Sequence, residues 1–252
     1  MTPSLAEGAR RLRELHRPGS PLLLPNAWDV WSARAVAAAG AAAIATTSAG
    51  VAESLGYADG EAMPAEVAFA AVARVASAVE LPVTADLEAG YGLDPEAFVA
   101  ALLDAGAVGC NLEDTDHGSG GLVPLERQAE RIAGVVEAAG HRGVKIVVNA
   151  RVDCFLRQPP SPERLGEALR RGRAYLDAGA DCVYPILAGD EEDLVALVRE
   201  LGVINAIRFA GGPSLTRLRE LGVARISLGP FLAREAGAWI TDRARALLAE
   251  LE

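Results

Sequence analysis

Three carboxylates stand where two consecutive β-rich runs end: Asp86 and Glu88 after the first run, and Glu113 after the second. Asp86 and Glu88 are two residues apart, so they project from the same side of an extended segment. If the runs are adjacent parallel strands, all three side chains converge. Carboxylates gathered in a partly buried pocket require a proton or a cation among them. Hard oxygen ligands suit Mg2+, with Mn2+ as the second candidate; the alternative is that these acids cap helices or pair with arginines.

Arg151 follows a later β-rich run and is expected across the mouth of the fold from the acids. A guanidinium binds a carboxylate or a phosphonate through two parallel hydrogen bonds. A cation on one side and Arg151 on the other would hold a small anionic acid. The competing interpretation is a structural ion pair of Arg151 with Asp153 or Glu113.

Bringing these residues together requires a fold in which several strand ends meet. Short β-rich runs alternate with longer helical patterns, which indicates βα units around a parallel sheet. The predicted strands span residues 22–25, 43–47, 82–86, 108–113, 144–150, 181–186, 203–209 and 225–228. The predicted helices span residues 28–39, 64–79, 95–105, 125–139, 162–178, 191–201, 215–221 and 231–248, and a further N-terminal helix spans residues 4–16.

Five of these helices end at a glycine that precedes the next strand, where a left-handed residue is expected: Gly40, Gly106, Gly179, Gly202 and Gly222. The 252 residues match the roughly 250 of a closed α/β barrel. We therefore predict an α/β fold, a single (β/α)8 TIM barrel domain over residues 1–252, whose extra N-terminal helix is placed to cap the barrel bottom.

Composition excludes several classes of partner. Acidic residues outnumber basic ones by 34 to 24, giving a net charge of -10, so we expect neither nucleic-acid nor membrane binding. No apolar stretch is long enough to cross a bilayer and no signal-peptide pattern opens the chain, which predicts a cytoplasmic protein. The three cysteines, Cys110, Cys154 and Cys182, form no CxxC pair and are expected to be inert packed thiols.

Several segments, taken in order, resemble the isocitrate lyase/phosphoenolpyruvate mutase superfamily over roughly residues 22–187. The Asp-x-Glu-x-Gly-Tyr-Gly run and the Glu-Asp pair are the specific part of the pattern. The matching segments are Pro25-Asn26-Ala27-Trp28-Asp29, Thr47-Ser48-Ala49-Gly50 with Leu55-Gly56 and Asp59, Asp86-Leu87-Glu88-Ala89-Gly90-Tyr91-Gly92, Asn111-Leu112-Glu113-Asp114 and Asn149-Ala150-Arg151.

The resemblance implies a Mg2+-dependent barrel that acts on small 2-oxo or 2-hydroxy carboxylic acids through an enolate-like species. By position, Asp86 would be the main metal ligand, and Glu88 and Glu113 would hold metal-bound waters. Arg151 would bind the substrate. The remaining implied substrate-site residues are Asp59, which would stand behind the direct ligands, and Thr47, Ser48 and Ala49, whose backbone N–H groups would bind a substrate carboxylate.

One loop departs from the family pattern. Lyases of the superfamily carry a Lys-x-Cys-Gly-His type mobile loop after strand four, whereas residues 114–123 contain neither lysine nor cysteine. Glycines in this loop fit a mobile lid, and His117 is its evident proton carrier; the alternative is a solvated loop histidine. The expected catalytic residues are Arg151, Glu113 and His117, and the expected activity is C–C cleavage or decarboxylation.

The residues support four other functions to different degrees. Phosphonopyruvate-type C–P chemistry is the first, although its members also use loop Lys and Asn side chains. A Schiff-base aldolase needs a lysine at the mouth of the barrel, and the single lysine, Lys145, opens strand five at the opposite end. A phosphate-binding barrel would use Gly211, Gly212 and Gly229, which turn geometry explains equally well. The fourth is a barrel that binds a 2-oxo acid without turnover.

The last predicted helix bears on assembly. The resemblance implies a homo-oligomer, a dimer or tetramer in which this helix is exchanged between subunits. Its apolar stripe could serve such an exchange or pack on its own barrel. The stripe consists of Phe231, Leu232, Trp239, Ile240, Leu247 and Leu248.

Overall fold

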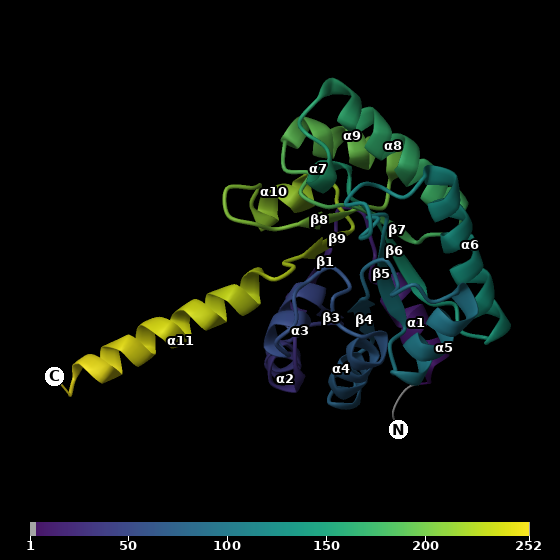
Figure 1. Ribbon diagram of the computed structural model, residues 1–252. Helices are drawn as coiled ribbons and strands as arrows, with labels where there is room; N and C mark the ends of the chain where they lie inside the picture. The colour runs from purple at the N-terminus through teal and green to yellow at the C-terminus, as the bar shows by residue number, and fades with distance from the viewer. Residues whose placement is uncertain (1–3, 252) are drawn as a thin grey trace.

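The computed structural model describes residues 4–251, in which eleven helices and nine strands alternate along the chain (Figure 1). The strands are β1 (Leu22–Leu24), β2 (Asn26–Ala27), β3 (Ile44–Thr46), β4 (Val83–Asp86), β5 (Gly109–Glu113), β6 (Val147–Val152), β7 (Cys182–Pro185), β8 (Asn205–Ile207) and β9 (Arg225–Ser227). The helices are α1 (Leu5–Glu14), α2 (Val30–Ala38), α3 (Ser48–Ser54), α4 (Ala65–Ser77), α5 (Pro95–Asp104), α6 (Leu125–His141), α7 (Cys154–Arg157), α8 (Pro162–Asp177), α9 (Glu191–Leu201), α10 (Leu215–Glu220) and α11 (Phe231–Ala249).

All strand pairs are parallel, and they form two sheets with the orders β2-β3-β4-β5-β6-β7 and β1-β9-β8. The sheets meet at Pro25, which separates β1 from β2 and has no N–H to donate to a ladder. They meet again between β7 and β8, where a single parallel bridge joins Val183 to Ile204. The strands thus follow one another around a barrel, as predicted, but regular pairing is interrupted at two seams. The predicted first strand, 22–25, ends one residue earlier, at Leu24, and Pro25 separates it from β2.

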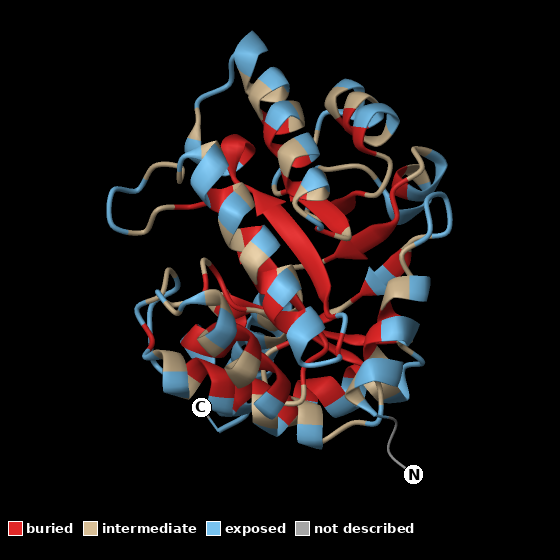
Figure 2. Cartoon of the chain, turned by 90° about the vertical axis from the view of Figure 1, so that its right-hand side faces the viewer, coloured by how far each residue is buried: buried red, intermediate tan, exposed pale blue. Residues whose placement is uncertain are grey.

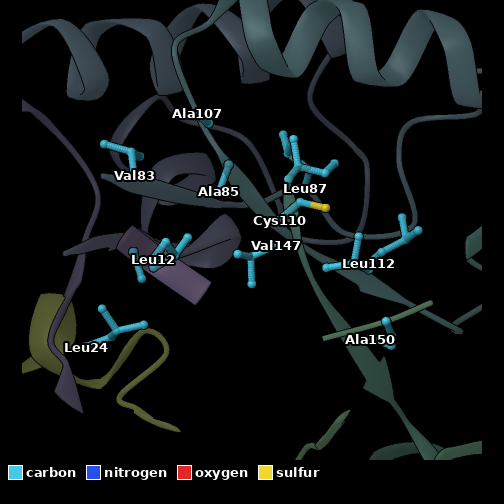
Figure 3. Packing of buried hydrophobic residues seen from close by; sticks show 14 of the residues in the cluster. Leu12, Leu24, Val83, Ala85, Leu87, Ala107, Cys110, Leu112, Val147 and Ala150 are labelled. Atoms are coloured by element: carbon cyan, nitrogen blue, oxygen red, sulfur yellow. The ribbon is translucent and has the colours of Figure 1, made fainter. Parts of the chain in front are cut away.

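The register of the central strands sorts side chains between two faces. Asp86 lies beside Asn111 and Asn111 beside Asn149, while Glu113 lies beside Arg151 and Arg151 beside Tyr184. Because successive strand residues point to opposite faces, these polar residues share the inner face of the barrel. Apolar residues between them, including Ala85, Cys110 and Leu112, face the surrounding helices (Figure 3).

Helices cover the outer face of the strands, and buried positions concentrate on the strands and the inward sides of the helices (Figure 2). The five glycines expected to stop helices all have positive φ, between 78° for Gly202 and 99° for Gly179, as predicted. Some strands end at other residues than predicted. Strand β6 extends to Val152, two residues beyond the predicted end, so Arg151 lies inside the strand. The short helices α3 and α7 were not predicted.

The N-terminal helix closes the bottom of the barrel, as expected. Leu12 is fully buried and lies among strand residues such as Val147 (Figure 3). A Cβ atom on Gly109 would stand 2.8 Å from Leu12 Cδ2, so the absence of a side chain at Gly109 makes room for this leucine. Arg13 Nε donates to Asp181 Oδ1 at 2.6 Å, and its Nη atoms donate to backbone carbonyls of Lys145 and Ile146. Helix α1 is therefore fixed to the starts of β6 and β7.

The last helix does not pack along its own barrel. Figure 1 shows α11 extending away from the rest of the molecule, and none of its residues is buried. Trp239 is 69% exposed and Leu248 is 66% exposed. Packing on its own barrel, one of the two alternatives for this helix, is therefore wrong.

We predict that His16 makes stability sensitive to acid. Burial lowers its pKa to about 4, helped by the nearby charge of Arg225, while the ring bonds the carbonyl of Leu12 at 2.9 Å. Between pH 6.5 and about 4 the unfolded chain binds a proton that the folded protein excludes, so the free energy of unfolding falls on acidification. The loss is at most about 3 kcal/mol.

Denaturant unfolding from pH 7 to pH 4 measures this effect. His16→Gln should flatten the pH dependence relative to the wild type, whereas His141→Gln, which changes a histidine whose side chain is 63% exposed, should not. Parallel pH profiles for wild type and His16→Gln would contradict the assignment.

Candidate functional site

The candidate site lies at the C-terminal ends of β4, β5 and β6, the end at which barrels of this kind carry function. The β5–β6 register sets Glu113 beside Arg151. Just past the end of β4, the backbone N–H of Glu113 donates to the carbonyl of Glu88 at 2.9 Å. Strand pairing thus brings Glu88 and Glu113 together, as expected from their positions after neighbouring strands.

Glu88, Glu113 and His117 form the centre of the site. One ligand atom from each lies within 4.8 Å of the other two. His117 Nε2 is 3.0 Å from Glu113 Oε1 and 3.9 Å from Glu88 Oε2. Both glutamates are only 2% exposed. Two buried carboxylates and an imidazole that share one point are a set of groups that could hold a metal ion.

The pKa values of the groups in the cluster differ from their ordinary values. Burial raises the pKa of Glu113 to about 7, although Arg151 and His117 oppose this shift. Burial also raises the pKa of Glu88. Contact with the Glu113 carboxylate, 3.0 Å from Nε2, raises the pKa of His117. These upward shifts follow from placing several acids in a poorly solvated space.

Asp86 points into the same region from the end of β4. Its Oδ2 accepts hydrogen bonds from the backbone N–H and the hydroxyl of Ser48, both at 3.1 Å. Its Oδ1 is buried and has no hydrogen-bond partner within residues 4–251. An unsatisfied buried carboxylate oxygen is costly, and a cation or a donor on a ligand would satisfy it. The donor set thus fits a divalent metal ion.

Arg151 is already engaged by acids of its own chain. Its Nε and Nη2 donate to the two oxygens of Asp153 at 2.7 and 2.8 Å, and its Nη1 is 2.5 Å from Glu113 Oε2. Although burial works in the opposite direction, Arg151 lowers the pKa of Asp153. The structure therefore contains both ion pairs of the competing interpretation. Of the five N–H groups of a guanidinium, these contacts leave two for another partner.

Glu88 is held by two residues that the sequence did not single out. Tyr91 Oη donates to Glu88 Oε1 at 2.9 Å, and the backbone N–H of Glu61 donates to Glu88 Oε2 at 2.6 Å. All three residues have positive φ, between 53° and 58°, a region that costs a non-glycine residue roughly 1–2 kcal/mol. Tyr91 stands in the Asp-x-Glu-x-Gly-Tyr-Gly run and could have been found there, but nothing local marks Glu61.

The expected substrate-binding residues lie at one edge of the cluster. Thr47 and Ser48 are buried at the end of β3 and the start of α3, and Ala49 is partly buried. The Ser48 backbone N–H, expected to bind a substrate, is bonded to Asp86. Asp59 is exposed on the loop after α3, and its charge is one of the secondary causes, after burial, that raise the pKa of Glu88.

Residues 114–123 form a short ordered hairpin that carries His117. Thr115 pairs with Leu122, and the backbone N–H of Val123 donates to the carbonyl of Asp114 at 2.8 Å. At the tip, Asp116 Oδ1 accepts from the backbone N–H of Gly118 at 3.0 Å. The hairpin is closed by its own hydrogen bonds, and it turns His117 toward the acids.

A fully buried carboxylate anchors this hairpin from behind. Asp114 Oδ2 accepts from Tyr175 Oη at 2.7 Å and from Arg171 Nη1 at 3.0 Å. Asp114 Oδ1 accepts from the backbone N–H of Asp153 at 2.8 Å, and Arg171 Nη1 also donates to the carbonyl of Val123. The network joins the ends of β5 and β6 to α8.

The structure also locates the groups of the alternative functions. Lys145 is exposed beside the N-terminal end of β6, the opposite end of that strand from Arg151. Gly212 packs against Phe209, where a Cβ atom would stand 3.1 Å from the ring. A groove of about 1350 Å3 between α1, α4 and α5 lies at the N-terminal end, away from the acids. The three cysteines are buried, and burial raises the pKa of each to about 12.

Comparison with known proteins identifies relatives across the chain. A family model described as phosphoenolpyruvate phosphomutase matches residues 12–248. The chain is 36% identical over 218 residues to an uncharacterised protein of Mycobacterium tuberculosis, which covers 86% of this chain and 80% of that protein. It is 31% identical over 192 residues to 2-methylisocitrate lyase of Bacillus subtilis, and this match covers 72% of this chain and 60% of that enzyme. A solved candidate phosphonomutase from Burkholderia cenocepacia J2315 superimposes with a TM-score of 0.92 at 39% identity, covering 96% and 99% of the chains.

We predict that Asp114 is the main structural support of the hairpin. Asp114→Ala should lower the free energy of unfolding by about 3 kcal/mol, because it removes the buried ion pair with Arg171 and the acceptor of Tyr175 Oη. Arg171 keeps its second carboxylate partner, Glu167. Tyr175→Phe, which removes one hydrogen bond and keeps the charge pair, should cost about 1 kcal/mol. Urea unfolding of both variants measures the difference, and equal losses would show that the ion pair is not the dominant contact.

Proposed function

Because the chain belongs to the phosphoenolpyruvate phosphomutase family, within the isocitrate lyase/phosphoenolpyruvate mutase superfamily, we propose that it is a metal-dependent lyase acting on a small 2-oxo or 2-hydroxy carboxylic acid. The family contains both lyases and mutases. The proposed reaction is cleavage of a C–C bond or decarboxylation.

One observation carries the proposal: buried acids that follow two neighbouring strands converge with an imidazole, and Arg151, expected across the mouth, instead contacts one of them, Glu113, from the next strand. A packed structural core would gain nothing from this arrangement, since each unsatisfied charge costs several kcal/mol to bury. The arrangement is instead what a cation and an anionic substrate would jointly stabilise.

We assign metal binding to Asp86, Glu88 and Glu113, with Mg2+ or Mn2+ as the ion, bound directly or through waters. The orphaned Asp86 Oδ1 and the paired acids support this role. When bound, a divalent ion would supply positive charge to substrate oxygens as the bond next to the carbonyl breaks. Ser48 would hold Asp86 in place, and Tyr91 would hold Glu88.

Substrate binding is assigned to Arg151 and to the segment Thr47-Ser48-Ala49, with Asp59 behind them. The two N–H groups of Arg151 that remain after its contacts with Asp153 and Glu113 suffice for one carboxylate oxygen or two. Because Asp153 fixes the guanidinium through two bonds, Arg151 would meet the substrate in a preset orientation.

Glu113 and His117 are the groups placed to act on protons. Burial raises the pKa of Glu113 to about 7, and His117 contacts it directly. The hairpin that carries it contains no cysteine or lysine, so the proton donor differs from that of the loop-cysteine lyases.

C–P chemistry is the second candidate, favoured by the candidate phosphonomutase of Burkholderia cenocepacia. A binder without turnover is the third. The charge of -10 gives no support to a nucleic-acid or membrane surface. Among residues 4–251 no helix has the combined length and apolarity needed to cross a bilayer.

We further propose a homo-oligomer in which α11 packs on a second copy of the chain. Its apolar side chains are exposed along the helix, with Trp239, Ile240 and Leu248 each more than half exposed. Contiguous apolar surface of this kind is expected to be covered in solution.

Metal dependence is tested by incubating the protein with oxaloacetate, and then with a panel of 2-oxo and 2-hydroxy acids, and following product release. EDTA should abolish turnover, and Mg2+ or Mn2+ should restore it. Asp86→Ala should lower kcat/KM by on the order of 100-fold, because a ligand of the ion is lost. Asp104→Ala, which removes an exposed acid at the other end of the barrel, is the matched control. EDTA-resistant turnover would refute the metal role, and tight binding of one acid without turnover would favour the binder.

Light scattering during size-exclusion chromatography tests the assembly. The wild type should elute as a dimer or tetramer, and the double variant Trp239→Glu, Leu248→Glu as a monomer, because two charges would be placed in an apolar contact. Leu215→Glu, at a leucine 42% exposed on α10, should leave the mass unchanged. A monomeric wild type would contradict the proposal.

A further inference from the structure

We propose that His117 binds the metal ion through Nε2, and that this imidazole makes the site select a first-row transition ion such as Co2+ or Zn2+ over Mg2+. The inference rests on the proposed metal-dependent function and deepens it, since it assigns a ligand and a class of ion to the same site.

Interatomic spacing is the first argument. His117 Nε2 lies 3.0 Å from Glu113 Oε1 and 3.9 Å from Glu88 Oε2. Around an ion with bonds of about 2.1 Å, adjacent octahedral ligands are about 3.0 Å apart and opposite ones about 4.2 Å apart. The 3.0 Å spacing matches adjacent ligands, and the 3.9 Å spacing lies between the two values. One ion could therefore contact all three residues after a small shift of the Glu88 carboxylate.

The orientation of the imidazole is the second argument. His117 Nε2 is buried and makes no hydrogen bond that meets ordinary geometric criteria within residues 4–251, although the Glu113 carboxylate is close. Nδ1 is on the other side of the ring, toward Gly60, where a Cβ atom would stand 3.4 Å from it. Nε2 is thus the nitrogen that faces the acids, and an ion would supply the partner that Nε2 lacks.

The hairpin fixes this orientation. Thr115 and Leu122 pair across its base, and Asp116 binds the backbone N–H of Gly118 at its tip. The residue between these contacts, His117, has its side chain only 17% exposed. Gly60 has φ +94° and lies against the ring, so the loop after α3 closes the other side. His117 is held in place before any ligand arrives, which favours binding because little side-chain entropy remains to be lost.

Ligand chemistry then decides the class of ion. Mg2+ prefers oxygen ligands and retains several waters, so an imidazole adds little to its binding. Co2+, Ni2+ and Zn2+ bind imidazole nitrogen well, and they stand above Mn2+ in the usual order of affinity. One nitrogen beside two carboxylates therefore shifts preference toward these ions.

The experiment is paramagnetic NMR of the Co2+-loaded full-length protein. A Co2+-bound imidazole gives a strongly shifted N–H resonance that disappears in D2O. The chain has three histidines; His16 lies at the barrel bottom and His141 is exposed at the end of α6, so one shifted resonance can be assigned to His117. It should be present in the wild type and in His141→Gln and absent from His117→Gln. Calorimetric titration should show that His117→Gln weakens Co2+ binding by at least about tenfold while the Kd for Mg2+ stays within about threefold.

The outcomes separate this inference from the proposed function. Binding of Co2+ without a shifted imidazole resonance would overturn the role of His117 and leave the carboxylate site standing. Equal weakening of Co2+ and Mg2+ by His117→Gln would also overturn it, because the histidine would then only shape the hairpin. Failure of the wild type to take up either ion would overturn both proposals. The resonance in the wild type tests the assignment even if the variant does not fold.

Discussion

Like charges crowded into a space with little water constrain the whole C-terminal mouth of this protein. Asp86, Glu88, Glu113 and Asp153 project there, and Arg151 and His117 are the cationic partners in direct contact with them. Their mutual repulsion is offset by donors from several elements: Ser48 for Asp86, Tyr91 and Glu61 for Glu88, and Thr115 for Asp153. The elements around the mouth are therefore tied together by the need to satisfy these acids.

Much of this arrangement could be predicted from the sequence, because it follows from residue types and their spacing along the chain. Helix-stopping glycines marked five helix ends to within one residue. The alternation expected to set Asp86 and Glu88 on one side does not reach Glu88, which follows the end of β4 with φ 53°. Adjacent parallel strands then bring Glu113 beside Glu88. Period and chain order were sufficient for the barrel and for the convergence of Glu88 and Glu113, whereas the family followed from the resemblance of motifs.

What could not be read depends on contacts between distant parts of the chain. Glu61 reaches Glu88 from a loop with no motif, and the choice between substrate and Asp153 as partner of Arg151 depends on side-chain geometry. The interruption at Pro25 depends on whether a neighbouring strand would require a backbone N–H donor at that position. The sequence could not predict that α11 leaves its own barrel. An amphipathic pattern is the same whether the helix packs on its own barrel or on that of another copy.

The attachment of α1 has a consequence for the synthesis of the chain. Arg13 bonds Asp181, 168 residues later, and β1 pairs with β9 near the other end of the chain. During translation the first helix and the first strand leave the ribosome long before their partners exist. Their apolar faces must remain without partners while the middle strands assemble, and that interval, with its exposure to chaperones and to misassembly, is set by the rate of elongation.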